Sequence, residues 1–499
     1  MILELKTKNL PPALHSDLPP VHSYSSLMKH KNRIGCLLLI AVSLLTGTVQ
    51  AEPARPNIVL MMADDLGWGD VHCFNPKSPI KTPQLDAMAA AGLQFNRFYS
   101  SSPVCSPTRG SCLTGRHPFR YGIYFANKGH LKSEELTLAE LLQNQGYATG
   151  HFGKWHLGTL TTEMKDANRG KPGNTKEFSP PWKNGFEVCF STESKVPTWD
   201  PMLKPAKDHH NGWDFIEDKS TAVPYGTHYW NEKGEVVGDN LDGDDSRVIM
   251  DRAVPFIEKA AKDGKPFFTV IWFHAPHLPV VAGPEYAAMY SQYDTYKRNY
   301  YGCVTALDEQ VGRLREALQQ AGVAENTMLW FGSDNGALSP GKAPGSVGDF
   351  RGGKRSLYEG GVRVSGILEW PARVRAGTQT EFPAVTSDYL PTILDELKVE
   401  YTGQRPLDGI SLLPVLAGTQ TERAQPIGFE SQGQLAWTTQ QYKLYSKNAG
   451  KTWELYNLLS DPSEKNNLAS AHPEQVAEMS KQLAAWRDSC GRSDQGGDY

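Results

Sequence analysis

Four segments of the chain consist of consecutive apolar residues that stop abruptly at polar side chains. They cover residues 57–63, 267–273 and 327–333, with a weaker run at 147–150. Unbroken apolar runs, in contrast to alternating ones, are typical of strands buried on both faces of a sheet. Amphipathic helical segments lie between them, over residues 82–91, 136–145, 246–262 and 300–321. This order of elements predicts an α/β sandwich around a mostly parallel sheet.

Chemically capable residues follow each of the four runs. They are Asp64, Asp65, Lys154, His156, His274, His277, Asp334 and Asn335. In parallel α/β sheets, ligands bind at the carboxyl ends of the strands. We therefore expect these side chains to face one site.

Two regions depart from this pattern. Residues 160–247 are polar, rich in Gly, Pro, Asn and Asp, and show little strand or helix periodicity, yet they hold four of the twelve tryptophans. A long irregular insertion is usually functional or disordered, and the tryptophans argue against disorder. Beyond residue 425, short strand-like segments precede a helix predicted over 473–488. We predict a main domain over 52–425, with 160–247 as a substrate-recognition insertion, and a small C-terminal α+β unit with a short antiparallel sheet over 426–499.

The N-terminal 51 residues are typical of a leader with an export signal that starts at Met28. Basic residues at 29–33 precede an apolar stretch at 34–45, and residues 48–51 resemble a signal-peptidase site. The apolar stretch is shorter than the roughly 20 residues that a membrane span needs, so we expect no stable span. The prediction is export to the periplasm or the extracellular space.

Charge and cysteine usage narrow the function classes. The net charge is −4, and without residues 1–51 the chain has 46 basic and 53 acidic residues, with no basic block. An acidic chain of this kind is not expected to bind nucleic acid. An anionic substrate therefore requires a local concentration of positive charge. The seven cysteines show no metal-ligand spacing, and in an exported protein one or two disulfides are expected, with pairing left open.

The two acidic strand ends suggest a cation. A single Asp-Asp pair such as Asp64-Asp65 is more often a turn or a helix cap. The second pair, Asp334-Asn335, favours convergence of both on one ion. Hard oxygen ligands suit Ca²⁺ or Mg²⁺, and no neighbouring His or Cys favours zinc.

The most specific motif is the stretch from Cys105 to Arg116. It contains Cys-x-Pro-Thr-Arg over 105–109, followed by Leu-Thr-Gly-Arg over 113–116. In this motif the chain resembles the type I, formylglycine-dependent sulfatases of the alkaline phosphatase superfamily, including bacterial arylsulfatases and carbohydrate sulfatases. Further blocks resemble that family in the same order, at residues 63–67, 153–158, 274–279, 334–336 and 352–363.

The resemblance implies an alkaline-phosphatase-like fold and a role for each matched residue. Cys105 is expected to be converted to formylglycine (3-oxoalanine) by a separate maturation enzyme, because a hydrated aldehyde offers one hydroxyl to attack sulfur and another to expel sulfate. One Ca²⁺ is expected, held by Asp64, Asp65, Asp334, Asn335 and residue 105. Arg109 would orient the hydrate, while Lys154 and Lys354 bind the sulfate. His277 would protonate the departing alcohol, and His156 would take a proton from the diol. Outside this resemblance, the favoured interpretation of His156 is a packed core residue, and that of Lys354 is part of a solvated basic loop.

Substrate contacts are predicted on the histidine loop and in the insertion. His274 either contacts the substrate beside His277 or packs behind it, and the insertion offers Trp199, His209 and His210. Tryptophans near polar groups suit sugar rings, but they also anchor loops that lack secondary structure. With export, they favour a sulfated carbohydrate over a small aryl sulfate.

Two alternatives stay open at this point. One is a phosphate or phosphonate ester hydrolase of the same fold, whose metal site is usually dinuclear and richer in histidine. The other is a non-catalytic carbohydrate-binding protein that keeps the Cys105 thiol. The sequence leaves open the sugar, the sulfate position, endo or exo action and the oligomeric state.

Overall fold

The computed structural model describes residues 55–207, 210–403 and 405–498. Residues 53–499 form one compact unit. The predicted export signal lies outside the described residues. Among the described helices, none is both long and apolar enough to cross a membrane.

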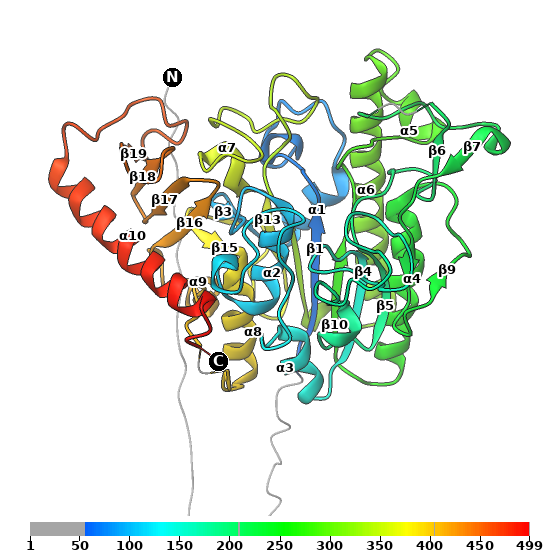
Figure 1. Cartoon of the computed structure of the whole chain (residues 1–499), viewed down its shortest axis with the longest axis horizontal. Helices are drawn as coiled ribbons and strands as arrows, with labels where there is room; N and C mark the ends of the chain where they lie inside the picture. The colour runs from blue at the N-terminus through cyan, green and yellow to red at the C-terminus, as the bar shows by residue number, and fades with distance from the viewer. Residues whose placement is uncertain (1–54, 208–209, 404, 499) are drawn as a thin grey trace, which may run out of the picture. The chain divides into compact units, whose positions relative to one another are not determined.

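A ten-stranded sheet forms the centre of this unit (Figure 1). Five neighbouring strands, in the order β11-β1-β10-β4-β5, run parallel, whereas antiparallel pairs lie towards both edges. Across the whole sheet the strands are β14 (Thr378–Thr380), β2 (Leu93–Phe95), β13 (Gly366–Glu369), β11 (Thr327–Ser333), β1 (Asn57–Ala63), β10 (Phe267–Trp272), β4 (Ala148–Lys154), β5 (Val188–Thr192), β8 (Tyr229–Trp230) and β9 (Val236–Val237). The sandwich with a parallel centre is confirmed.

Helices cover both faces of the sheet, which explains why the central strands are apolar throughout. On one face, Val59 and Met61 of β1 join a core with α1 (Pro83–Ala91), α4 (Asp245–Lys262) and α6 (Thr295–Gln320). On the other face, Ile58 and Leu60 join a core with α2 (Cys105–Thr114), α3 (Leu138–Asn144) and α8 (Tyr389–Leu397). Every residue of β1 is buried because alternate side chains enter these two cores.

The parallel register brings the polar residues at the strand ends to one edge of the sheet. Ala63, the last residue of β1, pairs with Ser333, the last of β11. Asp64 and Asp334 are therefore neighbours at that edge. On the other side of β1, the ends of β10 and β4 lie next to one another, with Trp272 paired to Gly153.

The expectation that residues 160–247 contain little regular structure is wrong at one edge of the sheet. There, β5 pairs with β4 in parallel, and β8 and β9 extend the same sheet. The segment also forms a separate hairpin of β6 (Leu203–Pro205) and β7 (Ala222–Pro224). These strands have two to five residues, which is too short to produce a period-two signal in the sequence.

The C-terminal residues form a separate four-stranded antiparallel sheet covered by one long helix (Figure 1). Its elements are β16 (Ile427–Ser431), β17 (Gln434–Thr438), β18 (Tyr442–Ser446), β19 (Glu454–Asn457) and α10 (Pro473–Asp494). The remaining strands and α-helices are β3 (Phe98–Tyr99), β12 (Arg363–Val364), β15 (Ala384–Val385), α5 (Pro284–Ala288), α7 (Glu359–Val362) and α9 (Leu413–Leu416).

The expected disulfides do not form among the described residues, where all six cysteines are free. Cys112, Cys189, Cys303 and Cys490 lie on four different elements, α2, β5, α6 and α10. Each is buried, and the elements that carry them belong to different layers of the fold. Burial in separate places keeps these thiols apart.

Candidate active site

Three carboxylates and one amide meet where β1 and β11 end. Asp64, Asp65, Asp334 and Asn335 are all buried. The Asp65 backbone N–H donates to Asp334 Oδ1 at 3.1 Å, and Asn335 Nδ2 donates to Asp65 Oδ1 at 2.7 Å. The structure therefore brings together four of the five residues that are expected as metal ligands.

Cations from three other elements neutralise these carboxylates. Lys154, the last residue of β4, contacts Asp64 Oδ2 at 2.5 Å, and Arg109 Nη2 lies 2.6 Å from Asp334 Oδ2. Lys354 Nζ lies 2.6 Å from Asp65 Oδ1. Without these cations, the burial of three carboxylates would strongly destabilise the fold.

Cys105 is the first residue of α2, a helix that is buried along its whole length. Val104 is its N-cap, and the unpaired N–H groups of the first turn give this end a partial positive charge that favours a negative group at residue 105. Arg109, one turn later, lies on the same face of the helix, and its guanidinium packs over the ring of Trp272 at 5.2 Å. The helix thus directs both residues of the Cys-x-Pro-Thr-Arg motif into the site.

Burial and the surrounding charges act in opposite directions on the carboxylates of the site. Although burial opposes it, Lys154, His277 and Arg109 hold the pKa of Asp64 well below its usual range. Burial and the charge of Asp64 raise the pKa of Asp334 to about 7. Burial also raises the pKa of the Cys105 thiol, against the opposing effect of Lys154 and Lys354.

The donor set fits a hard divalent cation. Two buried oxygens, Asp64 Oδ1 and Asn335 Oδ1, have no hydrogen-bond partner within the described part of the chain. Potential ligand atoms of Asp64, Cys105 and Asp334 lie within 4.8 Å of one another. Three carboxylates with an amide oxygen are typical ligands of Ca²⁺.

The histidines assigned to proton transfer occupy different places beside this cluster. His277 Nε2 lies 3.7 Å from Asp65 Oδ2, and its Nδ1 lies 2.7 Å from the Leu278 carbonyl oxygen. His156 is buried, with Nε2 at 2.6 Å from Asn127 Oδ1 and Nδ1 without a partner among the described residues. Burial holds the pKa of His156 well below its usual range and lowers the pKa of His277 to about 3.

His274 lies in a different environment from His277. Its side chain is fully buried, and its ring nitrogens contact Thr192 Oγ1 at 2.7 Å and Asp245 Oδ2 at 2.8 Å. Thr192 ends β5 and Asp245 begins α4, so the histidine connects the insertion to the sheet and the helical layer. With both nitrogens occupied by protein groups, His274 holds these elements together.

The residues predicted in the insertion are not brought together in the same way. The half-buried indole of Trp199 packs on Gly283, where an added Cβ would lie 2.1 Å from the ring. Trp199 therefore covers the segment that follows the histidine loop. His210 is exposed, and His209 lies outside the described residues.

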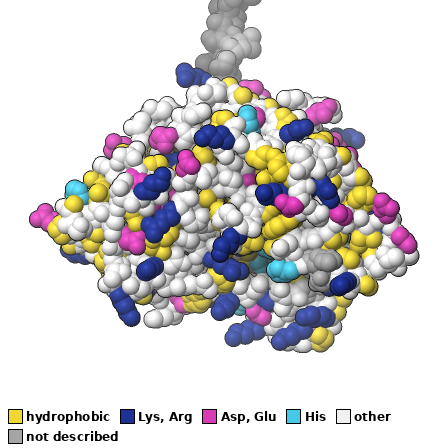
Figure 2. All heavy atoms as spheres, turned by 90° about the horizontal axis from the view of Figure 1, so that it is seen from above, with side chains coloured by type: hydrophobic (Ala, Val, Ile, Leu, Met, Phe, Trp, Pro, Cys, Tyr) yellow, Lys and Arg dark blue, Asp and Glu magenta, His cyan; other side chains and the backbone are white. Residues whose placement is uncertain are grey.

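One further cation was not identified from the sequence. Lys195, three residues after β5, is half-buried and makes no hydrogen bond or ion pair within the described residues. Burial and the nearby charges of Lys154 and Lys354 lower its pKa. Lys195 follows β5, a strand too short to predict from the sequence. Its position at the carboxyl edge of the sheet is therefore evident only from the fold. The face of the molecule seen in Figure 2 carries lysine and arginine side chains beside a histidine near its middle.

Comparison with known proteins gives consistent matches. A family model described as Sulfatase matches residues 56–399, and one described as N-sulphoglucosamine sulphohydrolase, C-terminal, matches residues 348–489. The chain is 31% identical over 436 residues to N-acetylgalactosamine-6-sulfatase of Canis lupus familiaris, covering 84% of this chain and 77% of that protein. It is 32% identical over 486 residues to arylsulfatase A of Homo sapiens, covering 89% of each.

Solved structures agree with these matches. A crystal structure of Ps i-CgsB in complex with k-i-k-neocarrahexaose has a TM-score of 0.74 at 27% identity, over 87% of this chain and 92% of that one. The ten-stranded sheet with its small antiparallel sheet is the alkaline-phosphatase-like fold of such structures.

Proposed function

The chain belongs to the sulfatase family and is a sulfuric ester hydrolase, and we propose that its substrate is a sulfated carbohydrate. The observation that carries the proposal is the position of Cys105, at the start of a buried helix, beside carboxylates and two lysines. Relatives named as acting on, or crystallised with, carbohydrates support the substrate class.

We further propose that residue 105 works as formylglycine, made by a separate maturation enzyme, and that Asp64, Asp65, Asp334 and Asn335 hold one Ca²⁺. Supporting this are the match of 105–109 to the family motif and the two unpartnered buried oxygens. A formylglycine at this position supplies a hydrated aldehyde as the nucleophile, and the Ca²⁺ supplies a Lewis acid for the sulfate oxygens.

The residues of the chain orient the reacting groups. Arg109 and the N-terminus of α2 favour negative charge on an oxygen attached to residue 105. Lys154 contacts Asp64, and Lys354 contacts Asp65. From these two sides of the carboxylate cluster, the two lysines bind the sulfate. Lys195 adds a positive charge that can meet a sulfate or a second anionic group of the sugar.

Two histidines carry the protons. The Nδ1–H of His277 donates to the Leu278 carbonyl, so Nε2 is the nitrogen left to exchange a proton with the departing alcohol oxygen. In His156, the Nε2 proton is directed to Asn127, which leaves Nδ1 bare to accept a proton when sulfate leaves. Burial favours the neutral imidazole that a base requires.

The phosphate or phosphonate alternative is the less supported one. Among the described residues, the groups able to hold a metal include only one histidine, His277. A dinuclear metal site for phosphate chemistry usually contains more histidine ligands. A non-catalytic protein gains nothing from two lysines, an arginine and two histidines around one cysteine.

The test compares rates on an aryl sulfate, the matching aryl phosphate, and defined sulfated mono- and oligosaccharides. Enzyme co-expressed with a maturation enzyme is used, and the peptide that contains residue 105 is weighed by mass spectrometry. We expect an aldehyde at residue 105, preference for sulfate over phosphate, and no turnover by Cys105→Ala. Undiminished hydrolysis by the unmodified thiol would contradict the aldehyde, and preference for phosphate would contradict the reaction. We also propose export, on the basis of the signal-like segment from Met28, which secretion of the full chain would test.

A further inference from the structure

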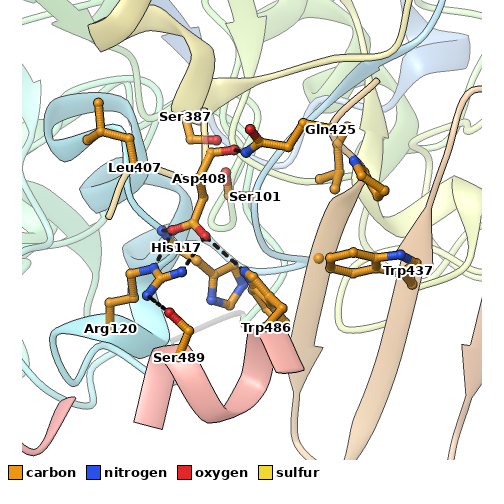
Figure 3. Close-up of a pocket in the computed structure, with 13 residues that line it drawn as sticks. Ser101, His117, Arg120, Ser387, Leu407, Asp408, Gln425, Trp437, Trp486 and Ser489 are labelled. Atoms are coloured by element: carbon orange, nitrogen blue, oxygen red, sulfur yellow. Dashed lines mark hydrogen bonds and ion pairs between the residues drawn. The ribbon is translucent and has the colours of Figure 1, made fainter. Parts of the chain in front are cut away.

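A cavity of about 250 Å³ lies between the segment that follows α2 and the C-terminal sheet (Figure 3). None of the residues assigned to the active site lines it. Cys105 is at the first position of α2, whereas His117 and Arg120 follow the opposite end of that ten-residue helix, which is about 15 Å long. The cavity therefore shares no lining residue with the active site, although Ser101, four residues before Cys105, also lines it.

The charges that line this cavity compensate one another. Arg120 makes a two-fold contact with Asp408, with Nε at 2.6 Å from Oδ2 and Nη2 at 2.9 Å from Oδ1. Asp408 also accepts from the Trp486 indole N–H at 2.8 Å and from the His117 backbone N–H at 2.6 Å. Burial lowers the pKa of His117 to about 3, so its ring is neutral. With no charge left over, neither a cation nor an anion is favoured.

Aromatic surface forms the walls on the side of the C-terminal unit. Trp437, on β17, lies across the cavity from the Arg120–Asp408 pair in Figure 3, and Trp486, on α10, lies beside that pair. The two indole rings are 6.0 Å apart at an angle of 51°. Their N–H groups are already bound, to Gln482 and to Asp408, so the rings offer apolar surface to an occupant.

Two neutral polar groups on the cavity lining are available for hydrogen bonds. The buried Ser387 hydroxyl and the Gln425 side-chain oxygen have no partner within the described residues. His117 is not a third such group, because it accepts the Phe119 N–H on Nδ1 and its remaining ring nitrogen faces the Ser101 backbone. An unpaired buried hydroxyl costs free energy that a ligand partner recovers.

From these observations we propose that this cavity is a second binding site, for one neutral sugar ring. A sugar presents an apolar face to aromatic rings and hydroxyls to donors and acceptors, which matches indoles with neutral polar groups. The volume lies just below the range of about 300–1,000 Å³ usual for small-molecule sites, so it admits a single ring and not an oligosaccharide. The inference does not depend on the proposed hydrolysis.

The experiment titrates the mature protein with unsulfated D-galactose and N-acetyl-D-galactosamine, observed by saturation-transfer NMR. We expect millimolar binding of at least one sugar, weakened about tenfold when Ser387→Ala and Gln425→Ala are combined, since two hydrogen bonds are lost. Gln425 is exposed at the edge of the cavity, so Gln425→Ala alone, with a smaller loss, serves if the double variant does not fold.

Two controls locate the binding. Gln420→Ala removes a half-buried glutamine that does not line the cavity, and Lys354→Ala changes the active site. Both are expected to bind the sugar as the unmodified protein does. The proposal is overturned if neither sugar binds, or if binding survives in Gln425→Ala unchanged and is lost in Lys354→Ala, which would place the sugar in the active site.

Discussion

The most instructive perturbation is Lys443→Met, which removes one cation from a buried charge cluster. Lys443 Nζ lies 3.0 Å from Glu359 Oε1 and 3.1 Å from Glu464 Oε1, and all three side chains are inaccessible to solvent. Glu359 begins α7, five residues after Lys354 of the active site. The cluster therefore joins β18 of the C-terminal sheet to the loop that carries Lys354.

The expected cost follows from what remains after the substitution. Removing one partner of a buried ion pair costs about 3–5 kcal/mol, because the other charge stays desolvated. Here two carboxylates lose their shared cation, although Glu359 keeps hydrogen bonds from Tyr99 at 2.9 Å and from Arg363 at 3.5 Å. We therefore expect a loss of about 4 kcal/mol in the free energy of unfolding near pH 8.

The loss depends on pH in a defined direction. Burial, together with the charge of Glu359, raises the pKa of Glu464 to about 7 even with Lys443 present. A carboxyl whose folded pKa exceeds its unfolded value binds more protons in the folded state, so stability falls as pH rises through that window. Without Lys443 the pKa rises further. The loss is then about 1.4 kcal/mol smaller near pH 5.5, because between pH 7 and pH 8 only the variant still holds the proton, and one pH unit corresponds to about 1.4 kcal/mol.

Equilibrium urea unfolding, followed by tryptophan fluorescence near pH 8 and near pH 5.5, measures both quantities. Lys447→Met is the matched control, because Lys447 is exposed just beyond the same strand. Adding Glu464→Gln to Lys443→Met is expected to recover part of the stability near pH 8. A loss below about 1 kcal/mol, or an equal loss at both pH values, would refute this account of the cluster.

Three further predictions concern the active site. Chelation of Ca²⁺ is expected to abolish turnover and to lower the midpoint of thermal unfolding by several degrees, reversibly, since an ion at 100 times its Kd contributes about 2.7 kcal/mol; a midpoint that chelator leaves unchanged contradicts the ion site. Lys195→Gln is expected to raise KM for sulfated sugars about tenfold with kcat little changed, whereas Lys207→Gln, at an exposed position, has no effect. Equal KM values for the two variants would show that Lys195 does not bind the substrate. Gly283→Ala is expected to displace the Trp199 indole, seen as a change in tryptophan fluorescence, and to weaken oligosaccharide turnover more than aryl sulfate turnover; parallel losses on both substrates would indicate a structural role alone.

The sequence by itself determined the layered fold and most of the charged site. Buried strands are visible as apolar runs because each run lies between two helical cores, and β1 and β11 were predicted to the residue for that reason. The polar residues at their ends were predictable as neighbours because parallel strands share one carboxyl edge. The motif at 105–109 is a local signal, so Cys105 was found without structure.

Tertiary structure decided the features that depend on residues far apart in the chain. The placement of Cys105 at a helix start rests on the packing of α2 in the core with α3 and α8, and nothing in its sequence periodicity predicts a helix. The ring of His274 is held between Thr192 at the end of β5 and Asp245 at the start of α4. These residues lie 82 and 29 positions before His274 in the sequence. On the lining of the cavity in Figure 3, Arg120 pairs with Asp408, which lies 288 residues later in the sequence. Such contacts arise from the packing of distant segments, which local sequence patterns do not predict.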